Sequence, residues 1–167
     1  MKISIVVAVA ENNAIGKNKG LLWHLPKDME FFRSVTYGHH VLMGRKSYES
    51  IPEKFRPLKG RVNIIVTRQK DFRAEGCKVV SGFEEGIEFA KDSGEEELMI
   101  LGGGEVYKQL LQKTDKIYLT KVHHSFPDAD TFFPELEKSE WKEVNNEKHP
   151  ADEKHKYDFE FTVLERN

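Results

Sequence analysis

The sequence predicts a single α/β domain over residues 1–167, with a mostly parallel central sheet of about eight strands flanked by about four helices. Short apolar runs alternate along the chain with segments of helical periodicity, which is typical of parallel strands joined by crossover helices. The last two apolar segments follow one another without a helix between them, and this indicates an antiparallel strand pair at the C-terminal edge of the sheet.

The first predicted strand is the run ISIVVAVA at residues 3–10, whose unbroken hydrophobicity is typical of a strand covered on both faces. The polar, glycine-bearing segment that follows, ENNAIGKNKGLL at residues 11–22, is expected to form a long loop. A helix is expected from Pro26, because proline suits the first helical turn and large apolar residues recur at helical spacing over residues 31–35.

The remaining elements continue the alternation, with no internal repeat or interdomain linker in the sequence. The other expected strands are residues 39–44, 61–67, 77–81, 97–104, 116–123, 141–148 and 157–166. The other expected helices are residues 45–51, 83–93 and 105–113. The charged run SGEEELM at residues 93–99 is expected to begin as a solvated loop between helix and strand.

Composition excludes several classes of protein. A formal net charge of −2 provides no field to attract a polyanion, so nucleic-acid binding is not expected. The single Cys77 excludes an intramolecular disulfide and a cysteine-based zinc site. Only eight uncharged residues separate Lys2 from Glu11, whereas a membrane-spanning helix needs about 20. A cytoplasmic protein without membrane association is therefore expected.

Two histidine pairs, His39-His40 and His123-His124, raise the question of a metal site. Adjacent residues on a strand point to opposite faces, so neither pair is expected to bind one ion. Surface or capping histidines are the expected interpretation, and no metal is expected.

Two strand–helix junctions, VLMG-RKS and MILGGG-EVY, place glycines where a buried strand meets a helix. A helix N-terminus offers free N–H groups to a phosphate, and ligands of open α/β sheets bind at the carboxyl ends of the strands. Two such junctions on one edge suggest a dinucleotide, although a glycine at this position is more often only part of a turn.

Basic and hydroxyl side chains at the first junction sharpen the dinucleotide hypothesis. Arg45, Lys46 and Ser47 begin the helix there, and Thr67 and Arg68 end the next strand. Two arginines suit an additional phosphomonoester, which favours NADP over NAD. The alternative is a solvated basic surface.

Asp28 lies among large apolar residues in LLWHLPKDMEFF, residues 21–32. Water is the most favourable environment for a carboxylate, so this position requires an explanation. Either Asp28 caps the helix, or its carboxylate holds a ligand in an apolar pocket.

Four segments, IGKNKGLLWHLPKDMEFF, VLMGRKSYESIPEKFRPLKGR, MILGGGEVY and DADTFFP, resemble the bacterial chromosomal dihydrofolate reductase family in order and spacing. The resemblance covers essentially the whole chain. It implies an enzyme that reduces 7,8-dihydrofolate to tetrahydrofolate with hydride from NADPH, that binds antifolates, and that is a monomer.

The resemblance also implies a substrate site. Asp28 would bind the pteridine together with Thr120, and Arg61 would pair with the glutamate α-carboxylate, with Arg56 as a looser contact. The residues implied as an apolar lining are Val6, Ala8, Met29, Phe32, Ile51, Phe55, Leu58 and Leu101.

The implied cofactor site joins the two glycine junctions, with a cis peptide expected between Gly102 and Gly103. Its residues are Ala8, Ile15, Gly16, Gly44, Arg45, Lys46, Ser47, Thr67, Arg68, Leu101, Gly102, Gly103, Gly104, Val106 and Tyr107. Residues 11–25 resemble the family's mobile lid, in which Leu21 and Trp23 would cover the catalytic site, with Asp130 holding the lid backbone.

Two rival functions differ from this one at identifiable residues. A pyrimidinone reductase of riboflavin synthesis would share the fold and cofactor but lack the W-x-L-P-x-D pattern that ends at Asp28. A non-catalytic dinucleotide-binding module would share the glycine junctions but would have no need of Asp28 or Arg61.

Overall fold

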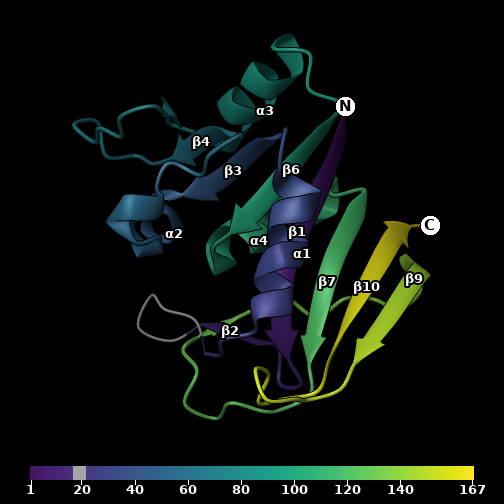
Figure 1. Cartoon of the computed structure of the whole chain (residues 1–167). Coiled ribbons are helices and arrows are strands. Elements are labelled where there is room, and N and C mark those ends of the chain that lie inside the picture. The colour runs from purple at the N-terminus through teal and green to yellow at the C-terminus, as the bar shows by residue number, and fades with distance from the viewer. Residues whose placement is uncertain (17–21) are drawn as a thin grey trace.

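The central sheet has eight strands in the order β5-β4-β3-β6-β1-β7-β10-β9, as seen in a computed structural model that describes residues 1–16 and 22–167 (Figure 1). The strands are β1 (Lys2–Ala10), β3 (His40–Gly44), β4 (Val62–Val66), β5 (Lys78–Val80), β6 (Glu97–Gly102), β7 (Lys116–Val122), β9 (Trp141–His149) and β10 (Phe159–Arg166). Neighbours from β5 to β7 are parallel, and β10 is antiparallel to both β7 and β9. The predicted mostly parallel sheet with an antiparallel C-terminal edge is confirmed.

Four α-helices lie close to the predicted positions. They are α1 (Pro26–Thr36), α2 (Arg45–Ser50), α3 (Phe83–Asp92) and α4 (Gly104–Leu110). Two 3₁₀ turns, η1 (Glu53–Phe55) and η2 (Leu111–Lys113), accompany them. The second turn takes up the end of the helix predicted over 105–113, because the last turn of a helix often tightens to 3₁₀ geometry.

A second, two-stranded sheet was not predicted. It pairs β2 (Ala14–Gly16) with β8 (Thr131–Phe132), and β2 lies inside the segment 11–22 that was expected to be loop throughout. That expectation is wrong for these three residues. Such a short strand has too few residues to show an alternating pattern, and its partner is distant in sequence.

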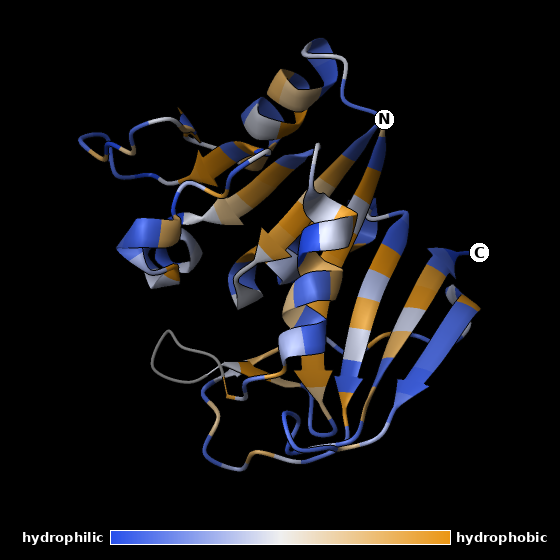
Figure 2. Ribbon diagram, in the orientation of Figure 1, coloured by the Kyte–Doolittle hydropathy of each residue, from blue (hydrophilic) through white to orange (hydrophobic). Residues whose placement is uncertain are grey.

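The central strands are buried on both faces, which explains their continuous hydrophobic runs. On one face, α1 and α2 pack on a cluster whose strand members are Val6, Val41, Met43, Ile65 and Met99. On the other face, α3 and α4 cover a larger cluster whose strand members include Ile5, Val7, Leu42, Ile64, Leu98 and Ile100. Figure 2 shows the contrast between these apolar strands and the hydrophilic edge strand β9.

Glu95 corrects the expectation of a solvated acidic loop, because its side chain is only 7% exposed. The Nδ1 atoms of His39 and His40 contact its two carboxylate oxygens at 2.9 and 2.8 Å. Burial alone would raise the pKa of Glu95, but these contacts and hydrogen bonds from the backbone N–H groups of His40 and Glu97 lower it to about 2. The expectation that adjacent histidines lie on a strand and point to opposite faces does not hold for His39 and His40, because His39 lies just before β3 begins.

The carboxyl ends of the parallel strands β4, β3, β6, β1 and β7 form one edge of the sheet. Gly44 on β3 is in register with Val66 on β4, and Met43 is in register with Gly102 on β6. Ala8 on β1 is in register with Thr120 on β7. Both glycine junctions and the first helix therefore meet at the edge where ligands of open α/β sheets bind.

Within the described residues, no helix combines the length and apolar character needed to cross a membrane.

Candidate active site at the carboxyl ends of the parallel strands

Asp28 lies in the first turn of α1 and faces the sheet. It is not the N-cap, because Leu25 occupies that position without a side-chain capping bond. The Asp28 carboxylate instead accepts a hydrogen bond from the Thr120 hydroxyl, with 2.6 Å between Oγ1 and Oδ1. Of the two interpretations of Asp28 that the sequence left open, this geometry excludes the helix cap and leaves the carboxylate as a candidate ligand-binding group.

The pKa of Asp28 reflects its position. Burial raises the pKa of this carboxyl above its usual range, and the hydrogen bond from Thr120 offsets part of that rise. A titratable group perturbed by desolvation beside a specific partner is typical of a functional site.

Two buried side chains shape the floor of the site between β1, β6 and β7. Thr120 is 2% exposed and lies beside Ala8 on the neighbouring strand. The Tyr107 hydroxyl donates to the carbonyl oxygens of Val6 and Leu101, each 2.8 Å away. Burial raises the pKa of Tyr107, so its hydroxyl remains a neutral donor that ties β1 to β6 beneath the site.

The structure gathers five of the predicted apolar lining residues into one cluster. These residues are Val6, Phe32, Ile51, Leu58 and Leu101. Met29 and Phe55 are outside this packed group, with 56% and 58% of their surface exposed. Their positions suit the mouth of a pocket rather than its wall.

Arg61 is half-buried on the same face of the sheet. Its Nη1 donates to the Thr36 hydroxyl at 3.1 Å, and its Nε donates to the Lys59 carbonyl at 2.8 Å. Burial, followed by the nearby charge of Arg33, lowers the pKa of Arg61. An anionic ligand would compensate this partly desolvated cation, which fits a carboxylate site.

Arg56, predicted as a looser substrate contact, is directed toward Tyr48. Its guanidinium lies 5.3 Å from the centre of that ring and donates to the Tyr48 carbonyl at 3.4 Å.

The two glycine junctions are in direct contact. A Cβ at Gly103 would lie 3.1 Å from Oγ of Ser47, and a Cβ at Gly104 would lie 2.9 Å from Cγ2 of Thr131. Only glycine fits without displacing a neighbour, so these positions require glycine for the close approach of the two junctions. The implied cis peptide between Gly102 and Gly103 is present. This cradle fits the pyrophosphate of a dinucleotide.

The predicted phosphate-binding side chains follow adjacent strand ends. Arg45 pairs with Glu49 at 2.5 Å, and the Thr67 hydroxyl accepts the N–H of Gln69 at 3.1 Å. Lys46 and Arg68 are exposed. Val106 was predicted to meet the pyrophosphate, but its side chain is 6% exposed and packs in the core, so only its backbone can face a ligand.

The described part of the predicted lid contacts its predicted partner loop. The carbonyl oxygen of Gly16 on β2 accepts a hydrogen bond from the backbone N–H of Asp130, with 3.1 Å between the two atoms. Trp23 is half-buried, with its ring 5.5 Å from that of Phe126. Leu21 and Gly20 lie outside the described residues.

The sequence matches the dihydrofolate reductase family model over residues 2–166. The chain belongs to the dihydrofolate reductase family. It is 43% identical to the dihydrofolate reductase of Bacillus subtilis (strain 168) over 164 residues, which is 98% of this chain and 94% of that protein. It is 45% identical to the dihydrofolate reductase of Haemophilus influenzae over 166 residues, which is 99% of both proteins.

Among solved structures, the chain resembles Enterococcus faecalis dihydrofolate reductase complexed with NADP(H) and RAB-propyl. The TM-score is 0.90 and the identity is 36%, with 99% of this chain and 96% of that chain covered. The predicted family, fold class and enzyme class, an NADPH-dependent dihydrofolate reductase, are therefore confirmed. The rival pyrimidinone reductase and the non-catalytic module lose their support.

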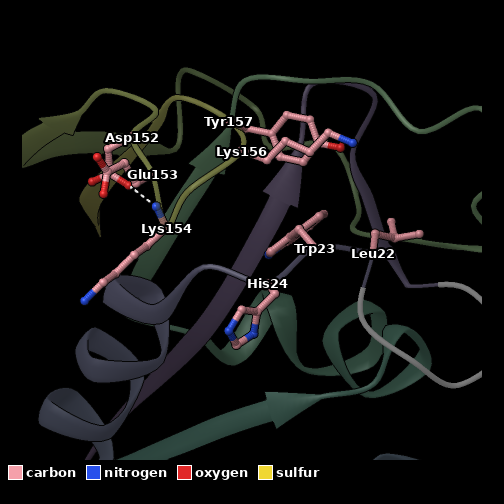
Figure 3. Close-up of a pocket in the computed structure, with 8 residues that line it drawn as sticks. All are labelled: Leu22, Trp23, His24, Asp152, Glu153, Lys154, Lys156 and Tyr157. Atoms are coloured by element: carbon pink, nitrogen blue, oxygen red, sulfur yellow. Dashed lines mark hydrogen bonds between the residues drawn. The ribbon is translucent and has the colours of Figure 1, made fainter.

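Two further features lie near this dihydrofolate reductase site. A cavity of about 520 Å³ separates Trp23 and His24 from the connection between β9 and β10 (Figure 3). His155 in that connection is buried, although its neighbours in sequence are charged and gave no local signal of burial. Within the described ranges, no group of three or more His, Cys, Asp or Glu side chains is placed to hold a metal ion.

Proposed function

We propose that this chain reduces 7,8-dihydrofolate with NADPH as one domain over residues 1–167, with Asp28 as the acidic residue that binds the pteridine. The half-buried Asp28 carboxylate, held by Thr120 at the carboxyl end of β7, is the observation that carries this proposal. A carboxylate can accept hydrogen bonds from the 2-amino group and N3 of a pteridine as a bidentate pair. Exclusion of water by the apolar neighbours strengthens that pair.

The remaining substrate contacts are those that the family resemblance implies, and the packing of these residues supports them. Val6, Ile51 and Leu101 line the pteridine site with Phe32 packing on the pterin, and Leu58 lies along the aminobenzoyl group. Arg61 binds the glutamate α-carboxylate, which compensates its partly buried charge. The exposed Met29 and Phe55 contact the ligand from the mouth of the pocket.

The same edge of the sheet supplies the cofactor site. The glycines of the two junctions admit the pyrophosphate, while Arg45, Lys46, Ser47, Thr67 and Arg68 bind the adenosine phosphates. Ala8, Ile15, Gly16 and Tyr107 border the nicotinamide, which supplies the hydride. Holding both rings at one site provides proximity and orientation, which is the protein's main contribution to the rate.

Asp28 also influences the proton that accompanies reduction. Water protonates N5 of the pterin, and the carboxylate assists through its hydrogen bonds to the ring. The lid segment 11–25 excludes bulk water, with Trp23 as a cover and the backbone contact between Asp130 and Gly16 as its support. Asp130→Ala keeps this backbone N–H and removes the carboxylate, which is proposed to hold the lid as well. The variant is expected to slow hydride transfer and speed cofactor release, and unchanged rates would contradict the role of the carboxylate.

The deciding experiment measures reduced-nicotinamide absorbance after mixing protein, NADPH and dihydrofolate. Wild type should consume NADPH rapidly. Asp28→Asn should lose most of its hydride-transfer rate at neutral pH and recover partly in acid, where substrate enters the site already protonated. Glu30→Gln, on an exposed position of the same helix, should retain the wild-type rate.

Two results would contradict the assignment. NADPH binding without oxidation by dihydrofolate would refute the activity. Failure of Asp28→Asn to recover in acid would refute the proton-related role of Asp28 while leaving its anchoring role intact.

The chain is also proposed to work as a cytoplasmic monomer that does not bind nucleic acid. The formal net charge of −2 supports the absence of nucleic-acid binding. Sedimentation as a single chain at micromolar concentration, with and without duplex DNA, would test both points.

A further inference from the structure

The start of α1 lacks a conventional cap. Leu25 occupies the N-cap position and offers no side-chain acceptor, and Pro26 has no N–H. The N–H groups of Asp28 and Met29 both donate to the Leu25 carbonyl, at 3.0 and 3.2 Å. The N–H of Lys27 therefore needs an acceptor from elsewhere in the fold.

That acceptor is His155, from the connection between β9 and β10. Its Nε2 accepts the Lys27 N–H at 3.1 Å, and its side chain is 3% exposed. A histidine near the C-terminus thus performs the role that a Ser, Thr or Asp usually performs at the start of a helix.

Asp152 fixes the protonation pattern of this imidazole. Because Nε2 accepts a hydrogen bond, its lone pair must be free and the proton must be on Nδ1. The Nδ1 atom lies 2.8 Å from Oδ1 of Asp152, which also accepts the backbone N–H groups of Lys154 and His155. Packing of the ring 5.0 Å from that of Phe159 holds the imidazole in place.

We propose that His155 is a positioning residue for Asp28, acting through its hydrogen bond to the adjoining residue in the first turn of α1. This inference rests on the proposed function. The 2.6 Å bond between Asp28 and Thr120 leaves little tolerance for movement of that turn. A displacement of about 1 Å at a catalytic group is enough to lower a rate substantially.

The same connection forms one wall of the cavity opposite Trp23 and His24, with Tyr157 and Lys156 directed across it (Figure 3). The hydrogen bond from the Lys27 N–H to His155 attaches this connection to α1. It therefore joins this wall of the cavity to the helix that carries Asp28.

The test compares His155→Leu, which removes the acceptor, with His155→Gln, whose side-chain oxygen can still accept the Lys27 N–H. In His155→Leu, dihydrofolate should bind about fivefold to tenfold more weakly, which is the change expected if the free energy usually lost with a helix cap is lost from binding. The pH midpoint of single-turnover hydride transfer should move toward acid, because a loosened first turn admits water to Asp28. His155→Gln should remain within about twofold of wild type in both measurements.

A matched control separates positioning from packing. His149 stacks on the same Phe159 ring at 5.1 Å, but its Nε2 contacts Glu147 rather than α1. His149→Leu should keep both the wild-type affinity for dihydrofolate and the wild-type pH midpoint. The affinity for NADPH should be unchanged in all three variants, because its site is built from other strand ends.

The inference is overturned if His155→Leu matches wild type, or if the Leu and Gln variants are equally impaired. Should His155→Leu fail to fold, Asp152→Ala and Asp152→Asn replace it. Asp152→Ala removes the acceptor of the Nδ1 proton and should move the pH midpoint toward acid, as in His155→Leu. Asp152→Asn keeps an oxygen acceptor and should keep the wild-type pH midpoint. Equal pH midpoints in the two Asp152 variants overturn the inference. Absence of turnover in wild type would instead refute the proposed function.

Discussion

Glu95→Gln should destabilise the fold at neutral pH but have little effect in strong acid. Both oxygens of the Glu95 carboxylate accept backbone N–H groups, from His40 on one side and from Glu96 and Glu97 on the other. Glutamine has one oxygen, so its amide nitrogen must face a donor on one of the two sides.

The size and pH range of the effect follow from the pKa of Glu95, which falls from 4.5 to about 2 in the fold. A carboxyl with a depressed folded pKa stabilises the fold fully above the unfolded pKa of 4.5, and this contribution is lost as the pH falls toward 2. At about 1.4 kcal/mol per pKa unit, the carboxylate contributes about 3 kcal/mol at neutral pH.

Urea unfolding followed by tryptophan fluorescence, repeated from about pH 7 to pH 3, measures this contribution. The difference between wild type and Glu95→Gln should be about 3 kcal/mol at neutral pH and should shrink steadily below pH 4.5. Glu96→Gln, at the exposed neighbouring position, is the matched control and should match wild type throughout. A difference that does not change with pH would refute the reasoning.

Three further predictions concern the active site. Burial raises the folded pKa of Asp28, so its ionised form costs stability as the pH rises. Asp28→Asn should therefore unfold at a higher urea concentration than wild type at neutral pH. Equal urea midpoints for the two proteins would contradict this prediction. Arg61→Met should weaken dihydrofolate binding roughly 10- to 100-fold in a fluorescence titration and leave NADPH binding unchanged, as expected for the loss of charge-assisted hydrogen bonds. Gly103→Ala should raise the Kd for NADPH about tenfold, because the added Cβ would lie 3.1 Å from Oγ of Ser47. An unaltered Kd for NADPH would contradict the assignment of Gly103 to the cofactor site.

The sequence was sufficient for the main elements because their signals are local. The apolar run at residues 3–10 and the helical spacing of apolar residues after Pro26 each depend on side chains within one strand or helix. The order of the strands and the pairing of Ala8 with Thr120 join distant segments, and no local pattern in the sequence specified them.

The errors share one physical cause, which is dependence on distant partners. β2 exists because β8 pairs with it, and nothing in residues 11–22 specifies that partner. Glu95 resembles its acidic neighbours in sequence, but the two histidines before and at the start of β3 make its burial favourable. His155 is hidden in the same way, since the N–H that it accepts belongs to α1.

The insertion of β6 between β3 and β1 has a consequence for synthesis of the chain. β1 is synthesised before the other strands of this sheet, but both of its neighbours, β6 and β7, are encoded roughly 100 residues later. At about 5–20 residues per second, β1 waits about 5–20 s with neither edge paired. During that interval an apolar strand is available to other nascent chains, so this segment should depend most on chaperone protection during translation.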